Sequence, residues 1–426
     1  MRRLRIGAIS QEMGPERTGA DAPGLTTSDC AAALAAAGEA GEQDGALLRL
    51  GLMSWLHFLN DGSSNYLPGV IPALLAELHI PLALVGTVMA ALVSGQALQP
   101  LCGWMADAVG GKLFVILGVA GTTLGGALVA LAPGYWSLVG SLVLIGVANA
   151  MFHPQALAAV RRMTSTRDGL FVSVFLVGGE LGRGLWPVLA SLVVVAVGLR
   201  MLWLLAIPAA LSIPLMAREL PGLARRPSHL PSLDWRSRAS DVAVLVLYAS
   251  LRSTLNYNLV TFVPILWVRR GGSLVGAATL VTTFFVVGIV GNLSGGYLAD
   301  RFGRRPVITT MSVLSAILLA VLMMVPAGLM WVVIAALGIA AFATLPLQIL
   351  ICQDVLPDNQ SMGSGFALGF SNGIGALAMI AMGFLAGRFG VVEVLWMNVA
   401  IAAMAAAIAP ALTDGVTAAV GTAASA

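Results

Sequence analysis

The chain has 426 residues, of which 58% are hydrophobic and only 10% are charged, with a formal net charge of +3 and a mean hydropathy of +0.91. An ordinary soluble domain carries about 25% charged residues, so this composition excludes a soluble globular protein and indicates an integral membrane protein. The three cysteines are scattered and form no C-x-x-C pair, so the sequence indicates neither a disulfide framework nor a metal site, and we expect no cofactor.

The first 46 residues differ in composition from the rest of the chain. They are rich in alanine and glycine, carry four arginines and seven acidic residues, and show no sustained hydrophobic period. Their apolar stretch LRIGAI is too short for the core of a signal peptide. We therefore predict an unstructured cytoplasmic tail over residues 1–46.

Twelve apolar segments of membrane-spanning length follow, each of about 20 residues or more. They lie at 47–76, 82–106, 113–132, 136–160, 170–198, 201–217, 241–267, 275–299, 307–326, 329–352, 361–386 and 391–412. Turn sequences such as APGY and VPAG separate several of them. The predicted fold is an all-α integral membrane protein with twelve transmembrane helices.

The basic residues are distributed unevenly between the two sides of the predicted membrane. With the termini inside, 17 of the 23 Lys and Arg residues are cytoplasmic, four are in outside loops, and Arg183 and Arg252 lie within spans. By the positive-inside rule both termini, including the tail 414–426, are cytoplasmic, as expected in a bacterial-type inner membrane. This distribution explains the sequence pI of about 9.0 without a nucleic-acid partner.

The two halves of the chain resemble each other. GWMADAVGGK, which begins at Gly103, recurs as GYLADRFGRR at Gly296, an offset of 193 residues, and SVFLVGGELG recurs as SGFALGFSNG. We therefore predict two six-helix bundles, residues 47–217 and 241–413, joined by a cytoplasmic linker at 218–240. Two repeated bundles with a site between them are typical of secondary transporters.

GYLADRFGRR is a full match to the signature loop of the major facilitator superfamily, and HFLND, FHP, VGGELG and LRS resemble its fosmidomycin-resistance branch. The resemblance implies a pseudo-symmetric monomer that exports small molecules against protons by alternating access. The branch usually carries an amide where Glu180 stands and small residues where Arg183 and Trp186 stand. Because these departures fall in the predicted cavity, the substrate need not be fosmidomycin.

The repeated signature loop predicts a conformational latch at helix ends, which breaks and reforms as the halves rock. The latch residues are Gly103, Asp107, Gly296, Asp300, Arg301 and Arg304. Ala108 and Gly111 replace the usual arginines in the first copy, which predicts a weaker latch there. The alternative is that these charges only set topology. Asp354 is interpreted as a solvated boundary charge.

Three spans carry polar residues at helical spacing, which places them on one face of each helix. Polar and ionisable groups within the membrane mark functional sites by default. The predicted proton-coupling residues are Asp61, Glu180 and His57. The predicted substrate-binding residues are Arg252, Arg183, Asn60, Asn65, Tyr248, Asn256 and His153. Together these faces predict an aqueous cavity between the bundles.

The charges in this cavity predict the class of substrate. Arginine cannot shed its charge when buried, so Arg183 and Arg252 each need an anion from the protein or the substrate. An anionic substrate at Arg252 would release a carboxylate that then takes a proton, which we interpret as antiport. Three structural alternatives stay open. Asp61 is then only a hydrogen-bond acceptor for its own helix backbone or for Arg252, Glu180 and Arg183 are a self-neutralising pair, and His153 is a partner for a kinked backbone.

The predicted function is a proton-coupled antiporter that exports a small polar or anionic antibiotic or metabolite. One alternative is a proton-coupled importer of a small organic anion. A remote alternative is an intramembrane serine hydrolase, because GFSNG at 369–373 matches G-x-S-x-G. Lys112 lacks the spacing of a Walker A motif, which argues against ATP-driven transport. The expected partners are protons, a small-molecule substrate and the lipid bilayer.

Overall fold

The fold is described from a computed structural model, over residues 27–109, 111–161, 163, 168–220, 239–355 and 366–413. Every regular element in these ranges is a helix. Most of the predicted linker and the predicted C-terminal tail lie outside the described residues. Residues from Leu48 onward form one compact unit, which contains every contact discussed below.

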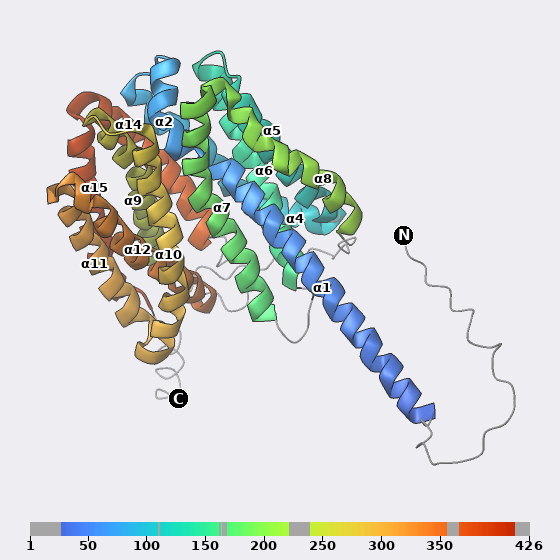
Figure 1. The fold of residues 1–426 in the computed structure, drawn as a ribbon. Helices are drawn as coiled ribbons and strands as arrows, with labels where there is room; N and C mark the ends of the chain where they lie inside the picture. The colour runs from blue at the N-terminus through green and yellow to red at the C-terminus, as the bar shows by residue number, and fades with distance from the viewer. Residues whose placement is uncertain are drawn as a thin grey trace, which may run out of the picture. The chain divides into compact units, whose positions relative to one another are not determined.

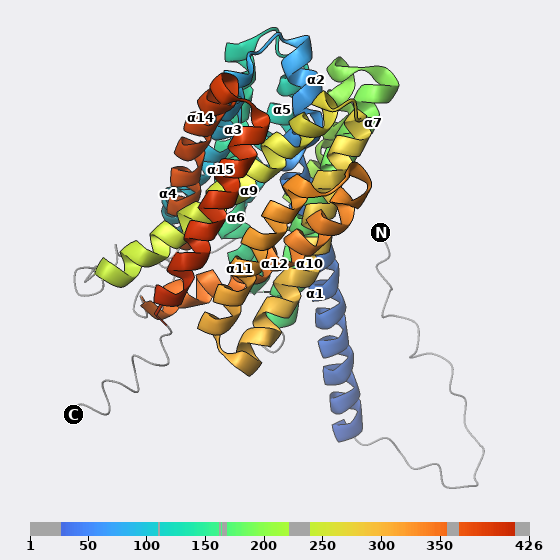
Figure 2. The same cartoon turned by 90° about the vertical axis from the view of Figure 1, so that its left-hand side faces the viewer.

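The N-terminal half is built from long helices with short 3-10 turns between some of them. Its elements are α1 (Thr27–Asn65), α2 (Leu67–Glu77), η1 (Leu82–Leu84), α3 (Val85–Ser94), η2 (Gly95–Leu98), α4 (Gln99–Val109), α5 (Gly111–Ala130), α6 (Tyr135–Arg161), α7 (Asp168–Val197), η3 (Leu199–Ala206) and α8 (Ile207–Glu219). Figures 1 and 2 show these helices side by side in the unit that begins at Leu48.

The C-terminal half is also built from long helices. Its elements are α9 (Ala239–Arg269), α10 (Leu274–Phe302), α11 (Arg304–Met324), η4 (Ala327–Leu329), α12 (Met330–Val355), the π-helix η6 (Phe366–Phe370), α14 (Ser371–Phe389), α15 (Val391–Ile408) and η7 (Ala409–Ala411). The GFSNG motif runs from η6 directly into α14. It therefore lacks the strand-to-helix turn that a nucleophilic serine of the hydrolase type requires.

Nine helical segments in the described ranges are long and apolar enough to cross a membrane. The other three predicted spans are also helical, but two are interrupted and the third is unusually polar. The first breaks between α1 and α2 at Tyr66, where Pro68 supplies no backbone N–H to the helix ladder. The second is interrupted by the 3-10 turn η2. The third is α9, whose polar residues include the charged Arg252.

Helix α1 begins earlier than the sequence predicted. It starts at Thr27, whereas the prediction left residues 1–46 unstructured. The segment 31–37 reads AAALAAA, and alanine has the highest intrinsic helix propensity of all residues. The absence of an amphipathic period therefore did not mean the absence of a helix.

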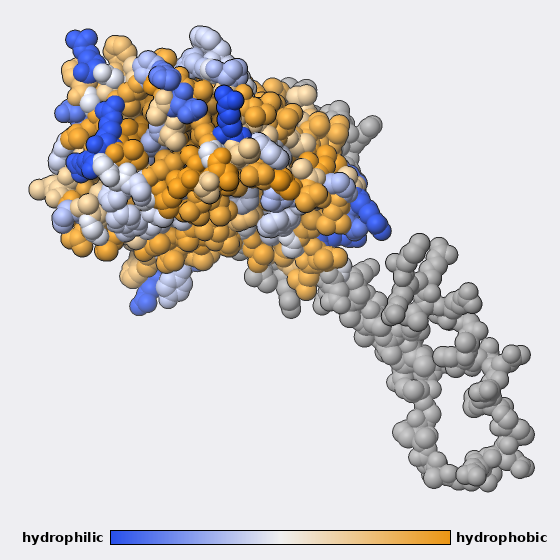
Figure 3. All heavy atoms as spheres, turned by 45° about the horizontal axis from the view of Figure 1, so that its top comes forward, coloured by the Kyte–Doolittle hydropathy of each residue, from blue (hydrophilic) through white to orange (hydrophobic). Residues whose placement is uncertain are grey.

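Large apolar side chains cover much of the surface. Met324, Leu211 and Leu377 are 77%, 75% and 68% exposed, and the face drawn in Figure 3 is mostly hydrophobic. A monomeric soluble protein rarely exposes so large an apolar area. This surface is the one expected to face lipid.

The two halves approach closely where α3 meets α14. A side chain on Gly86 would collide with the carbonyl of Met379, and one on Gly383 would collide with the backbone of Gly86. Gly387 lies equally close to Ala83. Small residues allow helix backbones to touch in a membrane. These glycines bring α3 and α14 into direct contact near η1 and the start of α15, a contact that we call the seal.

Candidate functional site

Asp61 is the centre of a buried polar cluster in the N-terminal half. Its carboxylate Oδ2 lies 2.9 Å from Arg183 Nη2 and 3.5 Å from His57 Nε2, and its Oδ1 lies 3.2 Å from His153 Nε2. Asn60 Nδ2 donates to Oδ1 at 3.2 Å. Asp61 itself has no exposed surface. The cost of burying this charge is offset by the Arg183 guanidinium and the Asn60 amide, which donate to Oδ2 and Oδ1 respectively.

Glycines on α7 allow this cluster to form. A side chain on Gly179 would collide with the His57 ring, and one on Gly182 would collide with the backbone of α1. With only hydrogen at these positions, α7 packs directly against α1. The next residue after Gly182 is Arg183, which this packing brings to Asp61.

Both histidines are oriented by backbone carbonyls. His57 Nδ1 lies 2.8 Å from the carbonyl oxygen of Phe175, and His153 Nδ1 lies 3.0 Å from that of Asn149. A carbonyl oxygen only accepts hydrogen bonds, so Nδ1 carries the proton in both rings and Nε2 faces Asp61. The His57 ring also stacks on Phe175 at 4.1 Å between centroids.

Arg183 joins two acids and reaches the other half. Its Nη1 lies 3.3 Å from Glu180 Oε1, while Glu180 Oε2 is buried without a hydrogen-bond partner. The guanidinium carbon lies 6.0 Å from the ring centroid of Phe285 on α10. The Glu180–Arg183 pair is therefore one part of a larger network, with Asp61 as a second anion.

Arg252 on α9 has a neutral partner. Its Nε donates to Gln348 Oε1 at 2.8 Å, and Gln348 Nε2 donates to the carbonyl oxygen of Ala367 at 2.7 Å. Over the described ranges, no carboxylate oxygen lies within 4.0 Å of its guanidinium. Arg252 nevertheless lies within electrostatic range of Glu180 and Arg183, so the two halves share one charged region.

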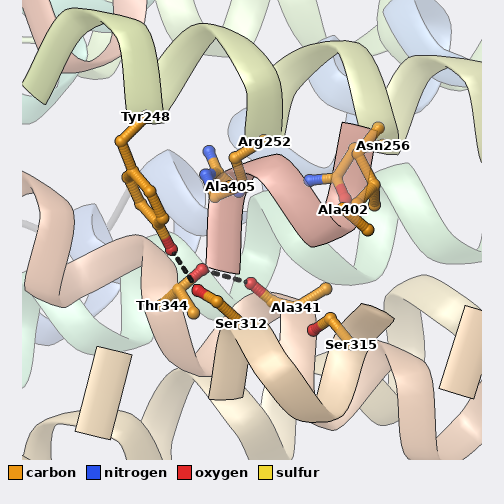
Figure 4. A pocket seen from close by; sticks show the side chains of 10 residues that line it. Tyr248, Arg252, Asn256, Ser312, Ser315, Ala341, Thr344, Ala402 and Ala405 are labelled. Atoms are coloured by element: carbon orange, nitrogen blue, oxygen red, sulfur yellow. Dashed lines mark hydrogen bonds between the residues drawn. The ribbon is translucent and has the colours of Figure 1, made fainter. Parts of the chain in front are cut away.

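Tyr248 and Asn256 line a small cavity inside the C-terminal bundle, together with Arg252 and side chains from α11, α12 and α15 (Figure 4). The Tyr248 hydroxyl points to α11, where it bonds to Ser312 Oγ at 2.8 Å. The cavity volume of about 20 Å³ accommodates one water molecule. Tyr248 and Arg252 are thus engaged within the C-terminal half, whereas Asn256 Oδ1 is buried without a partner.

Asn60 and Asn65 are engaged within the N-terminal half. Asn60 Oδ1 accepts a hydrogen bond from Thr122 Oγ1 at 3.1 Å, in addition to the donation to Asp61. Asn65 Nδ2 donates to the backbone carbonyl of Asp61 at 2.8 Å, one turn away. Both amides support the helix that carries Asp61.

Sequence reasoning missed a chain of amides that connects the halves. Asn372 Nδ2 donates to Gln96 Oε1 at 3.2 Å, and Ser253 Oγ donates to Asn372 Oδ1 at 2.9 Å. Gln348, the partner of Arg252, was also missed. The signal available in the sequence was an amide side chain within an apolar segment. Such a side chain must find a partner inside the protein, because lipid offers none.

The latch region contains an ion pair that the sequence did not predict. Arg304, at the start of α11, pairs with Asp354 near the end of α12. Asp354 was interpreted as a solvated boundary charge, and that interpretation was wrong. Helices α11 and α12 are neighbours, and Gly303 with φ 86° turns the chain so that Arg304 reaches across.

The remaining predicted latch residues are less constrained. In the described part of the chain, Asp300 and Arg301 form no ion pair, and the Arg301 guanidinium lies 5.5 Å from the Phe302 ring centroid. Gly103 accepts a hydrogen bond from Gln155 Nε2 at 3.3 Å through its carbonyl. Gly296 faces open space. The side chain of Asp107 lies outside the described residues.

Comparison with known proteins places this architecture in a family. The family model of the Major Facilitator Superfamily matches residues 53–272 and 245–421. A fosmidomycin resistance protein from Escherichia coli (strain K12) is 26% identical over 356 residues, which cover 79% of this chain and 86% of the relative. The MFS-type transporter YfnC of Bacillus subtilis (strain 168) is 26% identical over 345 residues, covering 77% and 84%.

Solved structures show the same fold. A mutant of the nucleoside transporter NupG superposes with a TM-score of 0.74 at 16% identity, covering 86% of this chain and 99% of that protein. A bacterial homolog of the human lysosomal transporter Spinster, in an inward-facing and unoccupied conformation, gives a TM-score of 0.72 at 14% identity, covering 86% and 97%. The chain belongs to the major facilitator superfamily and is a multi-pass membrane transporter rather than an enzyme.

Proposed function

We propose that this chain is a proton-coupled antiporter of the inner membrane, with both termini in the cytoplasm, that exports a small polar or anionic compound by alternating access. The observation that carries the substrate class is the neutral partner of Arg252. Export is supported by the relative that is named for fosmidomycin resistance and by a multidrug efflux pump that is 26% identical over 214 residues.

Arg252 is suited to bind an anionic group. The guanidinium keeps its charge when it is buried, and it has five N–H donors in a planar fork. One donor is given to Gln348, and no described carboxylate pairs with the others. A carboxylate or phosphonate would receive two parallel hydrogen bonds there.

Of the three predicted proton-coupling residues, we place the exchange at Glu180. Both oxygens of Asp61 already face donors, so a proton added there displaces at least one of them. Glu180 Oε2 is buried without a partner, so a proton can be added without breaking a described contact. Asp61 then serves to hold Arg183 in place when Glu180 is neutral.

The sign of the charges limits which substrates give antiport. A lone anion at Arg252 would favour proton binding at the nearby Glu180, so that anion and proton would travel together. Nor does Arg252 hold a carboxylate for the substrate to release. A zwitterion or polar compound behaves differently, because its ammonium or donor group takes the place of the proton at Glu180. Antiport at this site therefore favours a substrate with an anionic group for Arg252 and a donor for Glu180.

Alternating access is supported by the packing between the halves. The glycine contacts between α3 and α14 lie at the end that the positive-inside rule assigns to the outside. A structure that is sealed at this end corresponds to an inward-facing or occluded state. Opening of the outer end requires these contacts to separate. The polar residues near Arg183 and Arg252 then become accessible from the other side of the membrane.

A second candidate function is proton-coupled import of a small organic anion, and the charge argument at Arg252 and Glu180 favours it if the substrate lacks a donor group. The two functions differ in the direction of proton movement when substrate binds. Antiport predicts proton release, and cotransport predicts proton uptake.

The test begins with purified protein and a thermal-shift screen of carboxylates, phosphonates, zwitterions and lipophilic cations. Each stabilising compound is then added to the protein in weakly buffered solution with a pH-sensitive dye. Proton release, together with accumulation of the compound in inside-out vesicles, supports the proposed exporter. Proton uptake and accumulation in whole cells support the importer. Stabilisation by lipophilic cations alone contradicts the role of Arg252.

A further inference from the structure

We propose that His57, Asp61 and His153 form a binding site for one divalent transition-metal ion of the zinc type. The sequence analysis predicted no metal site, since His57 and His153 are 96 residues apart and no short motif links them. In the folded chain their ligand atoms and a carboxylate oxygen of Asp61 all lie within 4.8 Å of one another. Metal binding at this cluster does not depend on which substrate is carried.

The histidines already have the orientation that metal ligands need. Each donates its Nδ1–H to a backbone carbonyl, from Phe175 and Asn149 respectively, which leaves the Nε2 lone pair for a ligand. A ring N–H bonded to a carbonyl in this way is the usual support of a metal-bound histidine. His57 is 3% exposed, and its Nε2 has no hydrogen-bond partner. An unpartnered buried nitrogen aimed into the cluster points to a missing ligand.

The spacing of the ligand atoms fits a tetrahedral ion. Zinc–nitrogen and zinc–oxygen bonds of about 2.0–2.1 Å at tetrahedral angles separate neighbouring ligand atoms by roughly 3.3–3.4 Å. His153 Nε2 lies 3.2 Å from Asp61 Oδ1, which matches this spacing. His57 Nε2 lies 3.5 Å from the other oxygen, Oδ2, and the ligand atoms of the three residues all lie within 4.8 Å of one another. Small rotations of these side chains would close three bonds to one ion. The nitrogen ligands select zinc-type ions over calcium or magnesium, which prefer oxygen.

Arg183 is the obvious objection to a cation at this place. Its Nη2 contacts Asp61 Oδ2, so the ion would bind Oδ1, which among the described residues accepts only from the neutral Asn60 amide at 3.2 Å. Ligating carboxylates are commonly hydrogen-bonded in this way. Asp61 and Glu180 give the cluster two negative charges against the single positive charge of Arg183. The ion therefore enters a cluster of net negative charge when the histidines are neutral.

The site also has an entry path and an open position. The His153 side chain is 25% exposed, whereas those of His57 and Asp61 are 4% and 1% exposed, so an ion enters past His153. Three protein ligands leave the fourth position for water or for an anionic group. Because the ion would join α1 to α6 beside Arg183, we expect its binding to stabilise the N-terminal half and to slow transport.

The test uses the full chain, purified without a polyhistidine tag, and titrates it with Zn²⁺ and Co²⁺. We expect one ion per chain, a visible absorption spectrum typical of tetrahedral Co²⁺, and a higher unfolding temperature with Zn²⁺. His57→Ala and His153→Ala should each weaken binding roughly tenfold or more, since removal of even a supporting group costs 10- to 100-fold. His79→Ala is the matched control, because His79 lies between α2 and η1, away from the cluster, and should bind normally.

His153→Cys keeps a zinc ligand at the same position and should restore Zn²⁺ binding relative to His153→Ala. This rescue distinguishes a lost ligand from a misfolded variant. Binding that is absent in the native chain, that persists in both alanine variants, or that falls equally in His79→Ala would overturn the proposal. Each of these outcomes is independent of the substrate and of proton coupling, so the proposed transport function would be unaffected.

Discussion

Arg183 Nη2 on α7 lies 2.9 Å from Asp61 Oδ2 on α1, and this contact joins two residues that are 122 positions apart in the chain. Arg183 also holds Glu180, so a single cation serves two buried acids. Removing one member of a buried ion pair leaves an uncompensated charge and typically costs about 3–5 kcal/mol. The Arg183 side chain is 26% exposed, which places the expected loss near the lower end of that range.

The first prediction is that Arg183→Ala lowers the free energy of unfolding by about 3 kcal/mol. Denaturant unfolding of the purified protein in detergent measures this change. The double variant Arg183→Ala with Asp61→Asn removes both charges and should lose less stability than the sum of the two single variants. Additive losses would mean that the contact between Arg183 and Asp61 contributes little.

The second prediction concerns Gln348 and the neutral environment of Arg252. Gln348→Glu supplies Arg252 with a carboxylate from the protein. Anionic ligands must then compete with a charge-assisted hydrogen bond, so we expect them to bind roughly tenfold more weakly or worse. Gln96→Glu is the matched control, because it adds the same charge at the amide that accepts from Asn372. Equal affinity for the identified anionic ligand in Gln348→Glu and the native chain would contradict an anion site at Arg252.

Much of the fold followed from the sequence, because lipid imposes one length and one hydropathy on every span. The helical spacing of His57 and Asp61 was also readable, since residues four apart share a helix face. Which residue pairs with Asp61 was not readable. Arg252 was one candidate, but Arg183 is the partner, because glycines on α7 allow that helix to touch α1. Contacts between helices depend on packing that no local pattern specifies.

The third prediction separates Glu180 from Asp61. Glu180→Gln should abolish transport driven by a pH gradient, because the amide keeps the shape but cannot take a proton. Substrate exchange at equal pH should continue with lower affinity, because the amide oxygen still accepts from the donor group of the substrate. Asp61→Asn should instead lower stability, because it leaves Arg183 with one acid fewer. Proteoliposomes with and without a pH gradient distinguish the two effects. Full gradient-driven transport in Glu180→Gln would show that the coupling acid lies elsewhere.

The fourth prediction concerns the seal between α3 and α14. Gly387 lies against the Cβ of Ala83, so cysteines at both positions are close enough to form a disulfide after small backbone adjustments. In a background without the native cysteines, Ala83→Cys with Gly387→Cys should cross-link under mild oxidation and hold the outer end closed. Transport should then stop and recover when a reductant is added, because alternating access requires this end to open. Each single cysteine variant serves as the control, and the oxidant should not change its rate of transport. Continued transport by the fully cross-linked protein would mean that these helices do not separate during the cycle.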